Sequence, residues 1–170
     1  MASAVRRGAA AALVAAVLAA ASPPALSQAG PPAGAEARVR AQQVYVSVYS
    51  HVYAGDTDAR GRARAIALST LVSVRNVDAA VPLRIRSARY HDTEGRLLRD
   101  YATSPVLVPP LATREFFVAQ SDVAGGSGAS LVIAWESDAP ALPPLVEAVH
   151  LEVRGSRPIS FVTVGRPLDR

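Results

Sequence analysis

The sequence contains no cysteine and no lysine, and it has only three histidines. Without cysteine, the chain has no disulfides, no thiolate zinc ligands and no cysteine that could carry an N-terminal lipid. His51, His91 and His150 are far apart and do not have the spacing of metal ligands. The glycine-rich fingerprints of phosphate-binding and dinucleotide-binding loops are also missing. We therefore expect no metal and no cofactor.

One glycine-rich run resembles the nucleophile elbow of hydrolases. It reads Gly125-Gly126-Ser127-Gly128, but Ala129 stands where the elbow has its last glycine. The run also precedes a predicted strand, whereas a nucleophile elbow joins a strand to a helix. We therefore assign no catalytic residue, and we do not expect an enzyme.

The N-terminal 27 residues have the pattern of a secretory signal peptide. Arg6 and Arg7 precede an apolar run over Ala9–Ala21, and Ala25–Ser27 fits a cleavage site before Gln28. The run is shorter than the roughly 20 residues that a transmembrane helix needs. We expect a periplasmic or secreted protein with no transmembrane segment after cleavage; the alternative is an uncleaved N-terminal anchor.

The charge of the predicted mature chain is close to balanced. The sequence has 18 basic and 14 acidic residues, and loss of Arg6 and Arg7 with the signal peptide leaves 16 against 14. Nucleic-acid binding requires a concentrated basic surface, so we do not expect it. The remaining 143 residues (170 minus 27) suit a single domain. We expect a flexible leader over 28–42, with a helical turn near its end as an alternative, and one domain over 43–166.

The stretch from Val44 to Tyr53 alternates between two kinds of side chain. Its even positions are mostly valine, which suits a strand face packed on a core. Its odd positions include Tyr45, Tyr49, His51 and Tyr53. Tyrosines are enriched in contact surfaces, and their rings stack on sugars and peptides. We predict either a binding surface at these four residues or a face covered by loops.

Similar short runs continue along the chain at intervals of about 10 to 15 residues, separated by turn signals. They are Ile66–Arg75, Leu83–Tyr90, Leu97-Leu98, Val106–Val108, Arg114–Gln120, Leu131–Glu136, Leu145–Val153 and Ile159–Val164. No convincing helix lies between them. This spacing predicts an all-β fold: an antiparallel two-sheet sandwich of the immunoglobulin or fibronectin type, with seven to eight strands. A small barrel is the alternative.

Two further sites contain polar residues that bear on binding. The first is the run from Asp122 through Gly125, Gly126, Ser127 and Gly128, which suits a tight turn, an anion-binding nest of backbone N–H groups, or part of a Ca²⁺ site.

The second is Glu147, which is in phase with the apolar residues of its strand, Leu145, Val149, Leu151 and Val153. This phase directs the carboxylate toward the core, where it needs a partner such as Arg114 or Arg89. A bulge after Pro143-Pro144 would instead turn Glu147 outward.

Several blocks of the sequence together resemble a known family. They are YVSVYSHVYAGD, LVSVRNVD, YHDTEGRLLRDY, DVAGGSGASLVIAW, PPLVEAVHLEV and ISFVTVGR, in this order, from Val44 to about Arg166. They resemble the bacterial family called domain of unknown function 3124. The resemblance implies a small exported or envelope-associated protein with no assigned activity. Family members usually have asparagine where this chain has Ser130, so no side-chain amide role carries over to that position.

These observations favour an exported, non-catalytic binding or accessory module of the bacterial envelope. Its partner would be an envelope protein or a cell-wall glycan. The alternative is a hydrolase or ligand-binding enzyme that uses Glu147 together with His51 or Asp122. That alternative requires the side chains to converge in one cleft, because acid–base catalysis needs hydrogen-bond reach.

Overall fold

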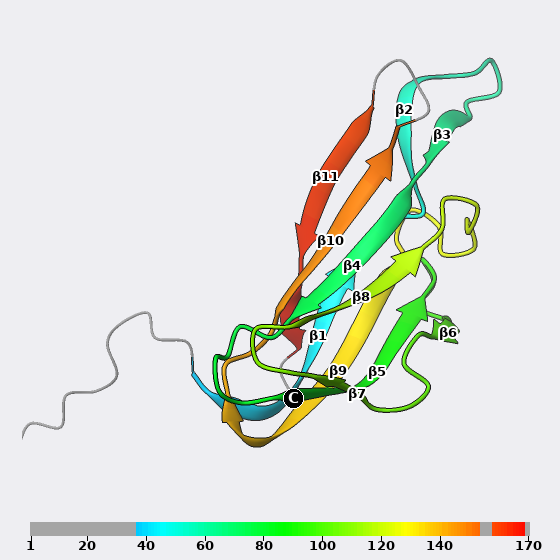
Figure 1. Ribbon diagram of the computed structural model, residues 1–170. Helices are drawn as coiled ribbons and strands as arrows, with labels where there is room; N and C mark the ends of the chain where they lie inside the picture. Colours follow the sequence, from blue (N-terminus) through cyan, green and yellow to red (C-terminus); the bar gives the residue numbers. More distant parts are fainter. Residues whose placement is uncertain (1–36, 154–157, 169–170) are drawn as a thin grey trace, which may run out of the picture. The chain divides into compact units, whose positions relative to one another are not determined.

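The computed structural model describes residues 37–153 and 158–168, which contain twelve β-strands and no helix. Figure 1 shows their arrangement. The strands are β1 (Val39–Ser47), β2 (His51–Thr57), β3 (Ala63–Ala67), β4 (Ser69–Arg75), β5 (Leu83–His91), β6 (Leu97–Asp100), β7 (Val106–Val108), β8 (Thr113–Val118), β9 (Ser130–Ala141), β10 (Leu145–Glu152), β11 (Ile159–Val164) and β12 (Arg166–Leu168). No helix in the described ranges is long and apolar enough to cross a membrane.

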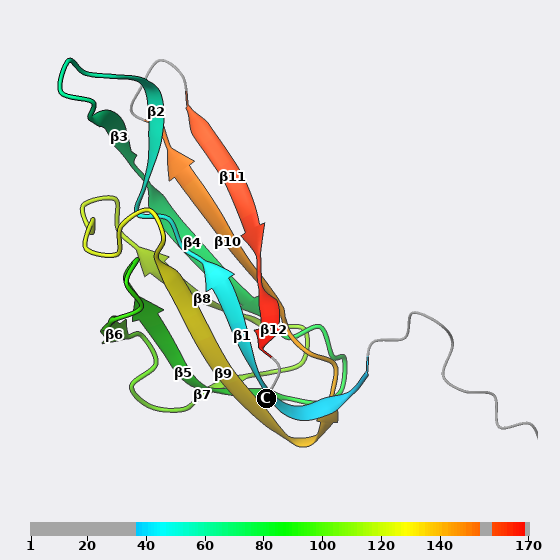
Figure 2. The same cartoon turned by 180° about the vertical axis from the view of Figure 1, so that it is seen from behind.

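The strands form two main sheets and a two-stranded ribbon. The front sheet, nearer the viewer in Figure 1, has the order β11-β10-β4-β8. The back sheet, nearer the viewer in Figure 2, has the order β12-β1-β9-β5-β6, with β7 also paired to β5. The ribbon consists of β2 and β3. Every pairing is antiparallel, and neither sheet closes into a barrel, so the predicted all-β sandwich is confirmed although it has more strands than expected.

The core lies between the two sheets and is built mainly from alternate residues of β1, β4, β5, β8, β9 and β10. Its buried side chains include Val44, Val46, Val72, Val74, Ile85, Tyr90, Leu131, Ile133, Trp135, Val146 and Ala148. Full burial of a large aliphatic side chain contributes about 1.5–3 kcal/mol, so this cluster is the main source of stability. The valine face predicted for the first strand is confirmed, since Val44, Val46 and Val48 are buried.

The predicted single strand from Val44 to Tyr53 is wrong, because β1 ends at Ser47 and β2 begins at His51. Between them Val48 still follows the register of β1 with β9, and Tyr49 bonds a side chain instead. Val48 N donates to Ala129 O at 2.9 Å, and Tyr49 N donates to His150 Nε2 at 3.1 Å. These bonds satisfy backbone N–H groups where the chain leaves the sheet. The chain then continues into the separate ribbon.

The flexible leader predicted over 28–42 is wrong at its C-terminal end, and so is the alternative helical turn there. β1 begins at Val39, and it pairs Val39 with Ala141 and Gln42 with Trp135. The arginines and glutamines of this segment show no apolar period, so only the pairing with β9 makes it a strand. The partner β9 likewise continues to Ala141, beyond the predicted end of this run at Glu136. The predicted signal peptide lies outside the described residues.

Asn76 links two segments at one end of the core. Its side-chain amide is buried and donates to the carbonyls of Val81, Val108 and Pro109 at 2.9, 3.2 and 3.1 Å. Its Oδ1 accepts from Asp78 N at 3.0 Å. One side chain thus joins the β4–β5 loop to β7.

Asp78 extends the same network toward β1 and β10. Its carboxylate is buried and accepts from the backbone N–H groups of Ala80, Val81 and Leu142 and from Arg38. These bonds, led by that from Ala80, lower the pKa of Asp78 from 3.8 to about 2. The carboxylate therefore stays ionised where it is held.

Candidate functional site

The four residues of the predicted tyrosine face lie on three different parts of the fold. Tyr45 is on β1 and half-buried on the outer face of the back sheet, opposite Val132 and Arg166 in the neighbouring strands. His51 and Tyr53 are on the β2–β3 ribbon, with ring centroids 5.1 Å apart and an edge-on arrangement. Of the four, only Tyr53 is mostly exposed, at 59%.

Tyr49 packs inside an aromatic cluster at the edge of the sandwich. Its ring meets His150 and Phe161 edge-on, at centroid distances of 5.4 and 5.6 Å. His150 in turn stacks on Phe161 at 4.5 Å. Burial lowers the pKa of His150, and backbone groups of Phe161 and Ala148 oppose the shift only in part. The four predicted residues therefore do not form one platform on which a ligand could stack.

The glycine-rich run is held in place by hydrogen bonds to Thr93 and Ser50. Gly125 O accepts from Thr93 N at 2.9 Å and from Thr93 Oγ1 at 3.1 Å, and Gly126 O accepts from Ser50 Oγ at 2.9 Å. Gly128 N donates to Thr93 Oγ1 at 3.0 Å. Ser127 is half-buried among them. The backbone groups that an anion-binding nest would use are thus partly committed to the protein itself, and the arrangement favours the predicted tight turn.

Glycine is required in this turn by close packing. A Cβ at Gly125 would lie 2.7 Å from Ala129 Cβ and closer still to the Tyr90 hydroxyl. Gly126 has φ +79°, in the region that glycine adopts without strain. The glycines therefore serve the fold, by letting this loop close over Tyr90.

Asp122 begins the same loop and makes local contacts. Its carboxylate accepts from Ala124 N at 3.3 Å and from the Arg99 guanidinium at 3.4 Å. Within residues 37–153 and 158–168, no group of three or more His, Asp and Glu side chains is placed to hold a metal ion. The arrangement of Asp122 therefore favours a capping role in the turn.

The predicted inward direction of Glu147 is wrong. The inward residues of β10 are Val146, Ala148 and His150, whereas Glu147 lies on the outer face and pairs with Arg75 at 3.5 Å. Apolar residues misled the prediction because the outer face of this strand is as apolar as the inner one.

The outward Glu147 also separates the residues of the hydrolase alternative. Glu147 pairs in register with Ser73 of β4 in the front sheet, whereas His51 pairs with Ala67 of β3 in the separate ribbon. Asp122 contacts Arg99 of β6 in the back sheet. Glu147 thus does not converge with either partner in one cleft.

The outer face of the front sheet carries a row of apolar side chains that crosses all four strands. In register, Val162 of β11 lies beside Val149 of β10, then Leu71 of β4 and Phe117 of β8. Phe117 is 58% exposed and Val162 is 53% exposed. This row, together with the nearby Leu145, Leu151 and Val164 on the same face, is called the apolar face below.

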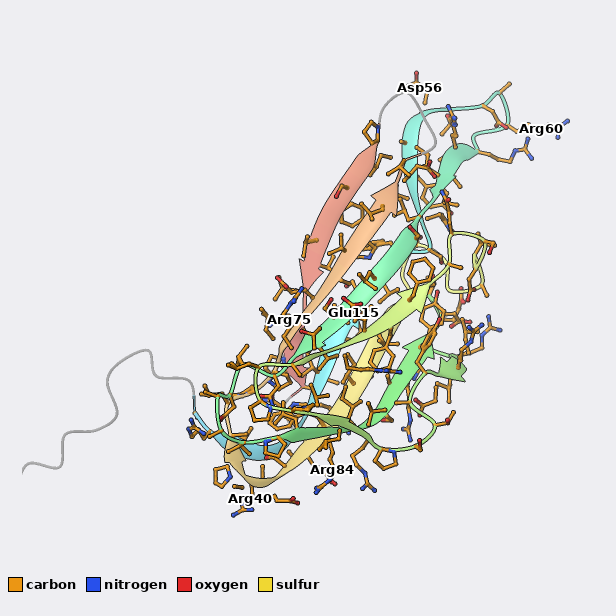
Figure 3. All side chains as sticks on the ribbon, viewed as in Figure 1. Arg40, Asp56, Arg60, Arg75, Arg84 and Glu115 are labelled. Atoms are coloured by element: carbon orange, nitrogen blue, oxygen red, sulfur yellow. The ribbon has the colours of Figure 1, made fainter. Side chains whose placement is uncertain are left out.

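A polar row runs across the sheet between the row of Val162 and Phe117 and the more distant Leu145. It consists of Glu147, Ser73 and Glu115 in neighbouring strands, with Arg75 one step further along β4. Figure 3 labels Arg75 and Glu115 on the front sheet. An exposed apolar centre beside a row of charged and hydroxyl groups has the composition of a protein contact surface.

A pocket of about 390 Å³ adjoins the apolar face at the end where β11 passes into β12. Leu145 and Val164 belong to both. The pocket is lined by Gln42, Val44, Val77, Pro143, Pro144, Leu145, Val146, Val164, Gly165 and Pro167. Its volume is in the range of small-ligand pockets, and its mostly apolar lining suits an apolar group.

The sequence does contain a signal for this face. In β10 and β11 both alternate sets of residues are largely apolar: Leu145, Val149 and Leu151 on one side of β10, and Val146 and Ala148 on the other. A strand with one solvated face usually alternates between apolar and polar residues, and β10 departs from that pattern.

The fold and these surfaces together define the class of protein: an antiparallel β-sandwich with a broad apolar outer face. Residues 41–168 match the profile of the family described as "Protein of unknown function (DUF3124)", and the chain belongs to this family, as the resemblance predicted. No curated protein matches the chain significantly. Among solved structures, "Crystal Structure of Thermotoga maritima 1070" matches with a TM-score of 0.36 and 10% identity, covering 74% of this chain and 92% of that one.

Proposed function

We propose that the protein is an exported, non-catalytic binding module of the bacterial envelope, and that it binds another envelope protein through the apolar face. The observation that carries the proposal is the row formed by Val162, Val149, Leu71 and Phe117 across the whole front sheet. The two outer members of this row are exposed, and the two central ones are half-buried. Contiguous exposed apolar surface is uncommon on a monomeric protein, and where it occurs it usually marks an interaction site.

The chemistry of the apolar face favours a protein over a glycan as the partner. A sugar would need exposed flat rings, and Phe117 is the only aromatic residue among those that make up the face. An anionic polymer would need concentrated positive charge, but Arg75 there is offset by Glu147 and Glu115. Aliphatic side chains bordered by both signs of charge and by serine suit the apolar surface of a folded protein.

The export part of the proposal rests on the N-terminal pattern of Arg6, Arg7 and Ala9–Ala21. Cell fractionation combined with the intact mass of the purified protein tests it. We expect a periplasmic or secreted species whose mass corresponds to a chain starting at Gln28. A cytoplasmic species that retains Met1 would contradict it.

The binding part is tested by affinity capture from envelope extract with matched variants. Leu71→Ser with Val149→Ser makes the centre of the apolar face polar, whereas Val132→Ser with Ala134→Ser makes the same type of change on the outer face of the back sheet. We expect one protein to bind the wild type and the back-sheet variant but not the front-sheet variant, and to rebind after purification. Equal capture by both variants would contradict the proposal.

A further inference from the structure

Strand β11 is a free edge of the front sheet with an unusual sequence. It pairs with β10 on one side only, and both Figure 1 and Figure 2 show it at the margin of the sheet. Its residues, Ile159–Val164, read ISFVTV and include no charge, proline or glycine. Natural proteins normally protect an edge strand with such residues, because unpaired backbone groups recruit other strands.

The other edges of the two sheets are protected in these ways. At the far edge of the front sheet, β8 carries Arg114 and Glu115. In the back sheet, β12 is short and contains Pro167, and β6 carries Arg99 and Asp100. The remaining edge strand of the back sheet, β7, has only three residues, between Pro105 and Pro109. Of these edges in the described part of the chain, β11 alone is long and unprotected.

The direction of the free backbone groups follows from one bond. Gly165 N donates to Val146 O at 2.8 Å, which makes this pair a hydrogen-bonded pair of the β10–β11 ladder. Because such pairs alternate in antiparallel ladders, Phe161 and Thr163 direct their N–H and C=O groups toward β10. Ser160, Val162 and Val164 therefore direct theirs away from it, to the side of the strand that pairs with β1 only from Arg166 onward.

We propose that β11 pairs with β11 of a second copy of this chain, antiparallel and centred on Val162. In that register Val162 faces Val162 of the other copy, and Ser160 faces Val164. The three outward residues are symmetric about Val162, so every free N–H and C=O of both strands finds a partner. Two-fold pairing of this kind is the commonest oligomer symmetry.

The sequence of β11 favours a second copy over a different strand. Side chains directly opposite in an antiparallel pair contact one another, and like charges there destabilise it. An uncharged strand with valine at its centre pairs with a second copy of itself without repulsion between like charges. Because the opposite edge of the sheet carries Arg114 and Glu115, growth stops at two copies.

The dimer goes beyond the proposed function and does not depend on it. Pairing at β11 continues the front sheet into the second copy, so Val162 would lie at the seam while Leu71 and Phe117 stay outside it. The two apolar faces would then form one surface, presenting two binding sites side by side.

The first test is the mass of the mature protein by sedimentation equilibrium, with two variants and one control. We expect twice the monomer mass for the wild type. Val162→Pro removes a free-edge donor and leaves the bonds to β10 intact, and Val162→Lys places like charges opposite each other; both should give monomers. Phe117→Lys, the same type of change at the protected edge, should remain dimeric.

The second test locates the seam by amide hydrogen exchange. Phe161 and Thr163 amides should be protected at every concentration, and the Val162 amide only at concentrations where the dimer forms. A monomeric wild type, a dimer unaffected by both Val162 variants, or fast exchange at Val162 in the dimer would each overturn the proposal. Assembly beyond two copies would contradict the inference that pairing stops at a dimer. The capture result with Leu71 and Val149 variants is independent of all these outcomes.

Discussion

Replacement of Asn76 by alanine should be among the most destabilising single changes at the end of the core. Asn76 is 2% exposed, and its amide serves the carbonyls of Val81, Val108 and Pro109 while accepting from Asp78 N. Alanine would leave at least two of these groups buried without a partner, among them the carbonyl of the buried Val108. Each such group costs about 1–3 kcal/mol.

The expected loss in free energy of unfolding is therefore about 2–5 kcal/mol. Domains of this size have only about 5–15 kcal/mol in all. Urea denaturation monitored by the fluorescence of the single tryptophan, Trp135, measures the loss. Val77→Ala in the same loop is the matched control, because Val77 is partly exposed and should cost less than about 1 kcal/mol.

Asn76→Asp separates the donor role of this residue from its size. Aspartate keeps the acceptor for Asp78 N but presents a second charged oxygen to carbonyls that need a donor. We expect it to cost at least as much as alanine at neutral pH. If Asn76→Ala were no more damaging than Val77→Ala, the reasoning on this network would be refuted.

Three further predictions concern pH and packing. The pKa of Asp78 falls from 3.8 to about 2 on folding, so its contribution to stability should be complete above about pH 4 and lost as the pH falls toward 2. In urea denaturation across this pH range, the stability of Asp78→Asn should depend less steeply on pH than that of the wild type. Burial lowers the pKa of His150 below 6.5, so folding favours the neutral ring and stability should decline as the pH falls below that value. NMR titration of the His150 ring should give a midpoint below 6.5. An unshifted midpoint would show that the ring is not buried. Gly125→Ala should destabilise by about 1–3 kcal/mol through overlap with Tyr90 and Ala129. An unchanged urea midpoint for this variant would contradict the close packing of the glycine-rich turn.

The period-two pattern predicted the sandwich and the core face of β1 because burial there separates apolar from polar residues cleanly. It failed in β10, where Leu145, Val149 and Leu151 are more apolar than the inward Ala148 and His150. Hydropathy identifies the face that avoids water, and it does not distinguish a core from a binding surface. The wrong direction predicted for Glu147 and the failure to predict the apolar face thus have the same cause.

Other features depended on contacts between residues distant in the sequence. The break after Ser47 depends on Ala129 and His150, which bond the backbone of Val48 and Tyr49. The tyrosines were predicted to share a face because a strand was expected to continue through this break. The free edge of β11 was likewise invisible, since strand order is set by pairing and leaves no local mark.

Photo-crosslinking in cells of the native host tests the central claim most directly. A photoreactive residue at Leu71 lies at the centre of the apolar face, and the same residue at Ser87 lies on the outer face of the back sheet. We predict a discrete crosslink from Leu71 to another envelope protein and none from Ser87. No product at Leu71, or the same products from both positions, would contradict a binding role for the apolar face.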